Sequence, residues 1–149
     1  MVPYDPIAMR RILFVCDGNT CRSPMAEAVA RRLLGGSIDI ASTGLEADEG
    51  ASATKDAVRV MKERGLDIRA HRSRSLSALN LLDFDLLIAL TPRIAQALRG
   101  EGADPSKLTA LDVPDPYCKG LETYRATAVV IERDLRRLFG LTPEEPRRE

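Results

Sequence analysis

The residues best suited to chemistry stand together near the N-terminus, in the stretch Cys16-Asp17-Gly18-Asn19-Thr20-Cys21-Arg22-Ser23. An apolar run over residues 12–15 precedes this stretch, and a helical pattern over residues 25–34 follows it. A loop that joins a strand to a helix directs backbone N–H groups and the positive end of the helix dipole at one point. Gly18 and Asn19 are the residue types that most readily adopt the positive φ of a tight loop. The stretch therefore predicts an anion site.

Two side chains of this stretch indicate that the anion is a phosphate group. Arg22 carries a planar fork of hydrogen-bond donors that matches phosphate oxygens. Cys16 would have the electropositive setting that favours a nucleophilic thiolate, although a cysteine is more often a small buried hydrophobe. The thiolate would attack phosphorus, and water would then hydrolyse the cysteinyl-phosphate. The N–H groups of residues 17–22 and Arg22 would hold the equatorial oxygens. Ser23 would donate a hydrogen bond to the sulfur, cap the helix, or do both.

Residues 16–24 also resemble C-x-G-N-x-C-R-S-P, the signature of the low-molecular-weight protein tyrosine phosphatases. A full match in a strand-to-helix context is much more specific than a lone C-x5-R. The resemblance extends from Arg11 to about Phe139. It implies a phosphoprotein phosphatase that needs no cofactor and releases inorganic phosphate.

Asp115 is the candidate for the general acid that protonates the leaving group. Asp-Pro pairs are ordinary turn formers, so the residues alone favour a turn here. The resemblance reverses this interpretation, because the family carries its acid in a D-P-[YF] loop, which Asp115-Pro116-Tyr117 matches. Tyr117 would then stand at the pocket wall, unless it is a core aromatic. Asp112 is the competing carboxylate and is interpreted as a turn residue, and Cys118 is interpreted as incidental.

Further roles are implied by the resemblance alone. Asn19, Ser42 and His71 would form a network that braces the phosphate loop (residues 16–23). Without the resemblance, His71 would be interpreted as structural, as a lone histidine more often is. Cys21 would form a reversible disulfide with Cys16 that protects the nucleophile from over-oxidation. Simple packing explains Cys21 equally well.

Thr20 bears on which phosphorylated side chain the pocket would take. Tyrosine-directed members of the family usually carry an aliphatic residue here and an aromatic residue in the loop after Ser42. The bacterial protein arginine phosphatases of the family carry threonine. This chain has no tryptophan, and its loop over residues 45–50 is acidic. A hydroxyl and nearby carboxylates suit a guanidinium, whereas a phenol ring packs best against apolar walls. Phosphotyrosine, the usual substrate of the family, and phosphoarginine both stay open.

Two other classes of function compete with a phosphatase. Thioredoxin-coupled arsenate reductases share this fold and loop, but they relay a disulfide through two further cysteines. The chain has no cysteine between Cys21 and Cys118, and thiol exchange depends on such access and spacing. The other alternative is a non-catalytic phosphate-binding module. The loop does not match G-x-x-x-x-G-K-[ST], which argues against a nucleotide site, and Cys16 and Cys21 lack the spacing and partners of a metal site.

The elements that must position these residues alternate along the chain. We expect strands over residues 12–15, 38–42, 84–90 and 108–111, and helices over residues 25–34, 52–64, 76–82, 92–98 and 121–139. This alternation predicts a single three-layer α/β domain, with a four-stranded parallel sheet, helices on both faces and the phosphate loop after the first strand. Ligands of such sheets bind beyond the carboxyl ends of the strands. Cys16, Ser42, Thr91 and Asp115 follow such ends and are expected to converge on one cleft.

The composition limits the remaining possibilities. A chain of 149 residues with 44% hydrophobic and 30% charged residues suits one domain. We expect that domain over residues 10–140, between a flexible arm (1–9) and a flexible tail (141–149). Zero net charge gives no field that would attract nucleic acid or an anionic membrane, and no apolar run reaches the ~20 residues of a membrane helix. Three cysteines favour a reducing compartment over a disulfide scaffold. We therefore expect a cytoplasmic monomer that acts on phosphorylated proteins.

Overall fold

A four-stranded parallel sheet forms the centre of the computed structural model, which describes residues 4–5 and 8–143. The expected arm (1–9) and tail (141–149) lie in large part outside these residues. The strands stand in the order β2-β1-β3-β4, and their bounds are Arg11–Cys16 (β1), Asp39–Gly44 (β2), Leu86–Ala89 (β3) and Leu108–Ala110 (β4). Val15 of β1 stands opposite Thr43 on one side and Ala89 on the other. Residues 12–16 are all buried, as a central parallel strand requires.

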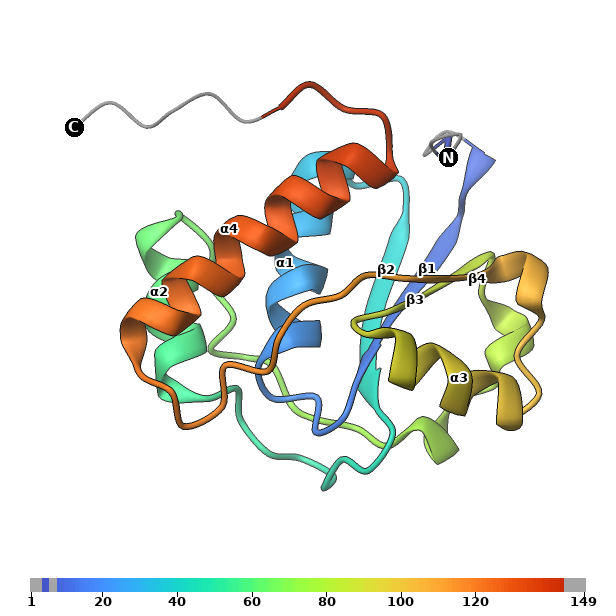
Figure 1. Cartoon of the computed structure of the whole chain (residues 1–149), viewed down its shortest axis with the longest axis horizontal. Coiled ribbons are helices and arrows are strands. Elements are labelled where there is room, and N and C mark those ends of the chain that lie inside the picture. Colours follow the sequence, from blue (N-terminus) through green and yellow to red (C-terminus); the bar gives the residue numbers. More distant parts are fainter. Residues whose placement is uncertain (1–3, 6–7, 144–149) are drawn as a thin grey trace.

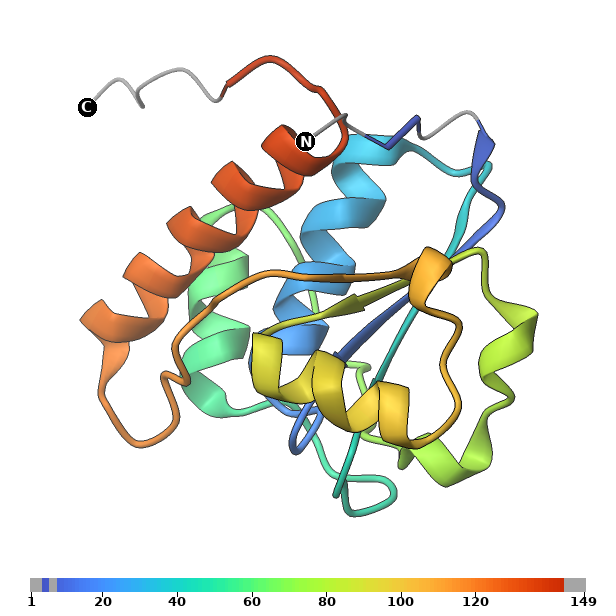
Figure 2. The same ribbon diagram turned by 45° about the vertical axis from the view of Figure 1, so that its right-hand side comes forward.

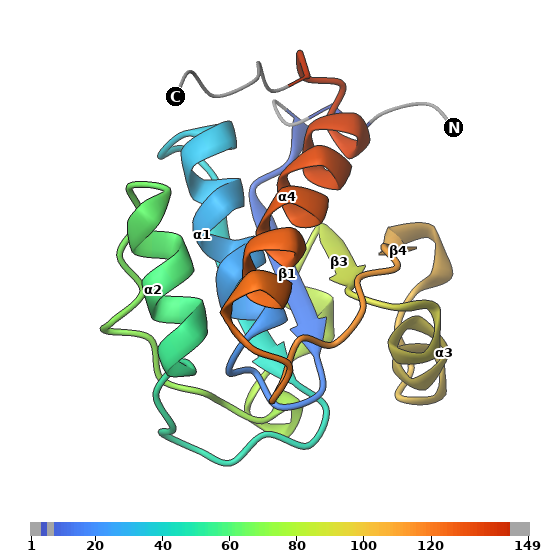
Figure 3. The same cartoon turned by 60° about the vertical axis from the view of Figure 1, so that its left-hand side comes forward.

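Helices cover both faces of this sheet, so the expected three-layer α/β architecture is confirmed. Helices α1 (Arg22–Leu34) and α4 (Leu121–Leu138) lie on one face, and α2 (Lys55–Glu63) packs beside α4 (Figures 1 and 3). Helix α3 (Pro92–Gly100) lies on the opposite face, and Figure 2 turns it toward the viewer. No helix in the described part of the chain is both long and apolar enough to cross a membrane.

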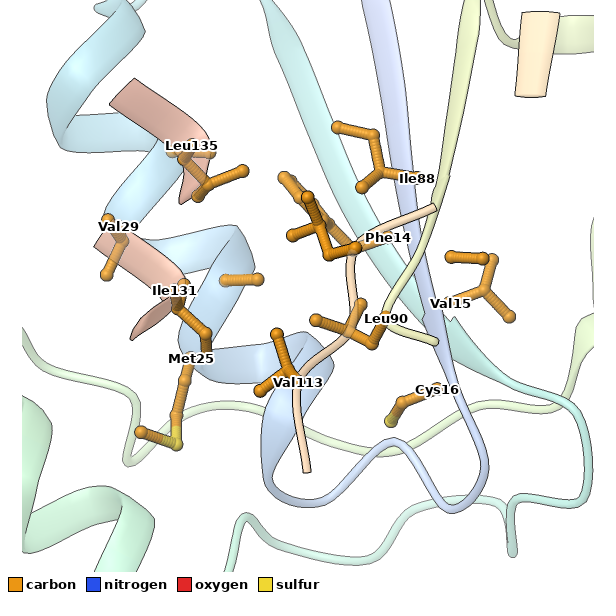
Figure 4. Close-up of a cluster of buried hydrophobic side chains, with 14 of the residues drawn as sticks. Phe14, Val15, Cys16, Met25, Val29, Ile88, Leu90, Val113, Ile131 and Leu135 are labelled. Atoms are coloured by element: carbon orange, nitrogen blue, oxygen red, sulfur yellow. The ribbon is translucent and has the colours of Figure 1, made fainter. Parts of the chain in front are cut away.

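The core between the sheet and the α1–α4 pair fixes the end of β1. Figure 4 shows Phe14 of β1 facing Met25 and Val29 of α1 and Ile131 and Leu135 of α4. The expected apolar stripe of α4 is buried, at Tyr124, Ala128, Ile131, Leu135 and Leu138. Burial of each such large side chain stabilises the fold by roughly 1.5–3 kcal/mol. Because side chains alternate along a strand, Cys16 shares the face of Phe14 and lies at the edge of this core (Figure 4).

The expected start of the first helix is wrong. We expected a helix over residues 25–34 that Ser23 could cap, but α1 begins at Arg22 after Cys21 and has no side-chain cap. Pro24 is tolerated in the first turn, because the N–H that it lacks has no partner within the helix there. The Ser23 hydroxyl is free of the capping role and lies instead 2.8 Å from the sulfur of Cys16.

Two other helical boundaries also differ from expectation. Residues 76–82 form two 3-10 turns, Leu76–Ala78 and Leu81–Asp83, rather than one helix. Their side-chain caps compete with a continuous helix, since Asn80 accepts the N–H of Leu82. Helix α2 begins after Thr54, whose hydroxyl accepts the N–H of Ala57, while Ser52 is paired with Arg72 in an isolated β-bridge.

Candidate active site

The expected phosphate loop lies at the carboxyl end of β1 and is clamped against the end of β2. Leu45 N–H donates to the Cys16 carbonyl oxygen at 2.9 Å, and Glu46 N–H donates to the Asp17 carbonyl oxygen at 3.0 Å. The two segments approach so closely that a Cβ atom at Gly44 would stand 2.5 Å from that Asp17 oxygen. Glycine is therefore required at position 44 for steric reasons.

The loop reverses at Asn19, which adopts a left-handed φ of 56°. Gly18 was expected to share this conformation, but its φ lies outside the positive range. The reversal falls on Asn19 because its side chain and its backbone are both held. Nδ2 donates to Ser23 Oγ at 2.9 Å and to Ser42 Oγ at 3.0 Å. Oδ1 accepts the N–H of Arg74 at 3.0 Å.

His71 completes this network from the far side of the loop. Its Nε2 lies 2.7 Å from the carbonyl oxygen of Asn19. The structure thus brings together Asn19, Ser42 and His71, which the resemblance implied as braces, and adds the backbone of Arg74. A fully buried asparagine with all of these contacts holds the loop in one shape.

Cys16 is buried at the base of the loop with two hydrogen-bonding groups at its sulfur. Ser23 Oγ lies 2.8 Å from Sγ, and the N–H of Asn19 donates to Sγ at 3.3 Å. Ser23 Oγ accepts from Asn19 Nδ2, and its own hydrogen has two acceptors, the sulfur at 2.8 Å and the Thr43 carbonyl oxygen at 3.5 Å, of which the sulfur is the nearer. Both contacts are of the kind that an anionic sulfur accepts.

Arg22 is only 3% exposed, and its guanidinium is oriented from two sides. Nη1 donates to the Val113 carbonyl oxygen at 3.0 Å, and Nη2 donates to Asp17 Oδ2 at 3.1 Å. Its Nε is buried and has no hydrogen-bond partner among the described residues. A buried donor without a partner is costly. This N–H is therefore suited to an oxyanion bound in the loop.

A cavity of about 330 Å³ opens over these groups. Cys16, Arg22 and Thr20 line it from the loop, and Asp115 and Tyr117 line it from the β4–α4 connection. Asp115 Oδ2 lies 3.8 Å from Arg22 Nη2, while Oδ1 accepts the N–H of Tyr117 at 3.1 Å. Tyr117 is 59% exposed and is no core aromatic.

Two of the expected residues lie outside this cavity. Ser42 lies beneath the loop, against Asn19. Thr91 caps α3 by accepting the N–H of Ile94 at 3.2 Å. The competing carboxylate, Asp112, lines a separate hollow beside Asp134 and Arg137.

All three cysteines are free thiols. Cys21 is buried, and its Sγ lies 3.8 Å from Asp115 Oδ1. Burial, and then the nearby Cys16 and Asp115, raise the pKa of the Cys21 thiol to about 11. Cys118 is exposed. In the described part of the chain, no group of three or more His, Cys, Asp and Glu side chains is placed to hold a metal ion.

Glu46 and Asp48 line the cavity from the acidic loop whose carboxylates were expected to suit a guanidinium. One charged residue of the site, Arg93, was missed by the sequence reasoning. Arg93 reaches Asp17 from α3, with Nη2 2.6 Å from each carboxylate oxygen. This hydrogen bond, and then the charges of Asp17 and Glu46, raise the pKa of Arg93. A signal existed, because Arg93 follows the carboxyl end of β3 by a few residues.

The chain is similar to known proteins over nearly its whole length. Residues 11–148 match the family model described as "Low molecular weight phosphotyrosine protein phosphatase". The probable low-molecular-weight protein-tyrosine-phosphatase EpsP of Ralstonia solanacearum is 34% identical, over 84% of this chain and 90% of that protein. A protein-arginine-phosphatase of Geobacillus stearothermophilus is also 34% identical, over 86% of this chain and 93% of that protein. The crystal structure of a low-molecular-weight protein tyrosine phosphatase from T. tengcongensis superposes with a TM-score of 0.81 at 36% identity, covering 88% of this chain and 98% of that one.

Proposed function

Because the chain belongs to the low-molecular-weight phosphotyrosine protein phosphatase family, we propose that it is a cysteine-dependent protein phosphatase and that Cys16, Arg22 and Asp115 carry the reaction. The observation that supports this most strongly is their convergence on one cavity from separate parts of the chain. Cys16 supplies a nucleophile at the base, and Arg22 supplies a buried donor without a partner among the described residues. Asp115 supplies a carboxyl group beside Arg22.

The reaction then runs in two steps. The Cys16 thiolate attacks phosphorus, an S–P bond forms, and the bond between phosphorus and the leaving atom breaks as Asp115 donates its proton to that atom. Arg22 and the loop N–H groups hold the three equatorial oxygens, where negative charge gathers in the transition state. Water then attacks phosphorus, Asp115 accepts its proton, and the S–P bond breaks to release inorganic phosphate and the thiolate.

We further propose phosphoarginine residues of proteins as the preferred substrate. Carboxylates surround the cavity, since Asp17, Glu46, Asp48 and Asp115 all line it. A guanidinium leaving group is cationic after protonation, and carboxylates at the cavity mouth stabilise a cation. Thr20 adds a hydroxyl to the wall, where an apolar side chain would favour a phenol ring. The relative named as a protein-arginine-phosphatase is as similar in sequence as the tyrosine phosphatase relative.

Phosphotyrosine is the second candidate, and one observation favours it. Tyr117 lines the cavity and leaves its ring largely exposed, so a substrate ring could pack against it. Most of the relatives named above act, by their names, on tyrosine.

A comparison of turnover on matched phosphoarginine and phosphotyrosine peptides separates the two substrates. We expect wild type to prefer phosphoarginine and Thr20→Ile to shift the ratio of kcat/KM toward phosphotyrosine by about tenfold, the effect of one hydrogen bond to a charged group. Thr20→Ser is the matched control, because it keeps the hydroxyl and should keep the preference. Wild type that ignores phosphoarginine would contradict this assignment and leave the phosphatase mechanism intact.

A further inference from the structure

Asp17 stands between two arginines at the edge of the phosphate loop. Its Oδ2 lies 3.1 Å from Nη2 of the buried Arg22, and both of its carboxylate oxygens lie 2.6 Å from Nη2 of Arg93. The family signature leaves this position open, and this chain fills it with a carboxylate. It sits directly after the nucleophile Cys16, where an acidic side chain repels an incoming phosphate.

The position of Arg93 is electrostatically unfavourable apart from its ion pair with Asp17. Arg93 is the second residue of α3, after the cap Thr91 and Pro92. The N-terminal turn of a helix carries partial positive charge, which disfavours a cation there. The Arg93 side chain is 66% exposed and could extend into water, yet it contacts both oxygens of Asp17.

The geometry around Arg22 shows what must change when phosphate binds. Asp17 takes up one Nη2 contact of Arg22, and the second carboxylate nearby, Asp115, lies 3.8 Å from the same nitrogen. A phosphate group adds negative charge beside both. The loop can therefore bind it only if the charge of Asp17 is balanced by another cation.

We propose that Arg93 is a positioning residue, which draws the Asp17 carboxylate away from Arg22 when phosphate enters and thereby sets the affinity of the loop for phosphate. This inference rests on the proposed function. It makes Arg93 act through Asp17, without touching the substrate. Removal of Arg93 should weaken phosphate binding only while Asp17 carries its charge.

The test is a double-mutant cycle on Asp17 and Arg93 with inorganic phosphate as the probe. Calorimetry at low ionic strength should show that Arg93→Ala weakens phosphate binding about fivefold, the scale of a partly exposed charge pair. Arg93→Lys should restore most of the affinity. Asp17→Asn should bind phosphate more tightly than wild type, and in that background Arg93→Ala should change the Kd less than twofold. Arg99→Ala, an exposed arginine at the other end of α3, is the matched control and should leave binding unchanged.

Turnover of p-nitrophenyl phosphate gives a second readout that a purely structural role would not move. We expect Arg93→Ala to raise KM by the same factor and to change kcat much less, with an unchanged Tm. An equal loss of affinity in both backgrounds, or no loss from Arg93→Ala, would overturn the inference while wild-type turnover still supports a phosphatase. Wild type that neither binds phosphate nor hydrolyses the ester would overturn the proposed function and the inference together.

Discussion

Nε2 of His71 lies 2.7 Å from the carbonyl oxygen of Asn19, the residue at which the phosphate loop reverses. Because a carbonyl oxygen only accepts hydrogen bonds, Nε2 must carry the hydrogen. A non-glycine residue at a φ of 56° persists only when its surroundings enforce that conformation. His71 therefore holds the backbone of the loop, while Ser42 and Arg74 hold the Asn19 side chain.

His71→Ala should loosen the loop without removing any group that contacts the substrate. We expect kcat/KM for p-nitrophenyl phosphate to fall about tenfold, the value of one part-buried hydrogen bond. Hydrogen exchange of the amides of residues 17–22 should become faster. The neighbouring Arg72→Ala changes an exposed side chain and serves as the control. Unchanged exchange and turnover in His71→Ala would show that the loop holds its shape without the ring.

Asp115→Asn should act most strongly on substrates with a poor leaving group. An amide cannot donate the proton, so we expect kcat for phenyl phosphate to fall about 100-fold or more. The loss should be much smaller for p-nitrophenyl phosphate, whose phenolate departs without help. Asp112→Asn is the control, because Asp112 lies in a different hollow. If the two aspartates gave equal losses, the assignment of the acid would be wrong.

Cys21 should make the fold less stable in alkali. The pKa of its thiol is raised from 9.0 to about 11 in the folded protein, mainly by burial. Between these values the unfolded chain ionises and the folded chain does not, so stability is complete below pH 9 and falls as pH rises toward 11. We expect the free energy of unfolding in urea to drop by about 2 kcal/mol over this range.

In Cys21→Ser most of this decrease in the free energy of unfolding should be absent. In Cys118→Ser, at an exposed position, the decrease should be unchanged. A smaller decrease in stability should remain in Cys21→Ser near the upper end of this pH range, because burial also raises the pKa of Tyr124 to about 12. An identical pH dependence in wild type and Cys21→Ser would contradict this account.

Glu132 should be important for stability, although it is not a residue of the candidate active site. Its carboxylate is 2% exposed and accepts from Arg64 and Arg136 at 3.1 Å, which joins the end of α2 to α4. Glu132→Gln removes a buried negative charge beside Arg64, whose side chain is 7% exposed, and beside the part-buried Arg136, so we expect a loss of about 3 kcal/mol in urea unfolding. Glu122→Gln, whose side chain is 84% exposed, should lose less than about 1 kcal/mol. Equal losses would contradict the role of burial.

The sequence predicts the sheet and the four main helices from periodicity, and it predicts the convergence of Cys16 and Asp115 from a rule of parallel sheets. The same rule places Ser42 and Thr91 in the cleft, where they do not lie. The sequence does not predict where the loop reverses. Asn19 takes the left-handed conformation because Ser42, His71 and Arg74 reach it from distant segments. Local propensity favoured Gly18 just as much.

Contacts between segments that are distant in the sequence also explain the other differences between expectation and structure. Ser23 was expected to contact the sulfur, to cap the helix, or to do both, and only the contact with Cys16 is made. Arg93 has no signal beyond its place after β3, and its contact with Asp17 becomes visible only when α3 is placed next to the loop. The Val113 carbonyl that orients Arg22 is a backbone group and has no signature in the sequence.

The most direct measurement of the central claim is rapid-quench mass spectrometry during turnover of p-nitrophenyl phosphate. We expect a burst of about one equivalent of p-nitrophenolate per enzyme and, at the same time, one phosphoryl group on the peptide that contains Cys16. Cys16→Ala should show neither. Hydrolysis by wild type without any adduct on Cys16, or a burst that persists in Cys16→Ala, would contradict the account. Phosphate binding without a burst would identify a non-catalytic phosphate-binding module instead.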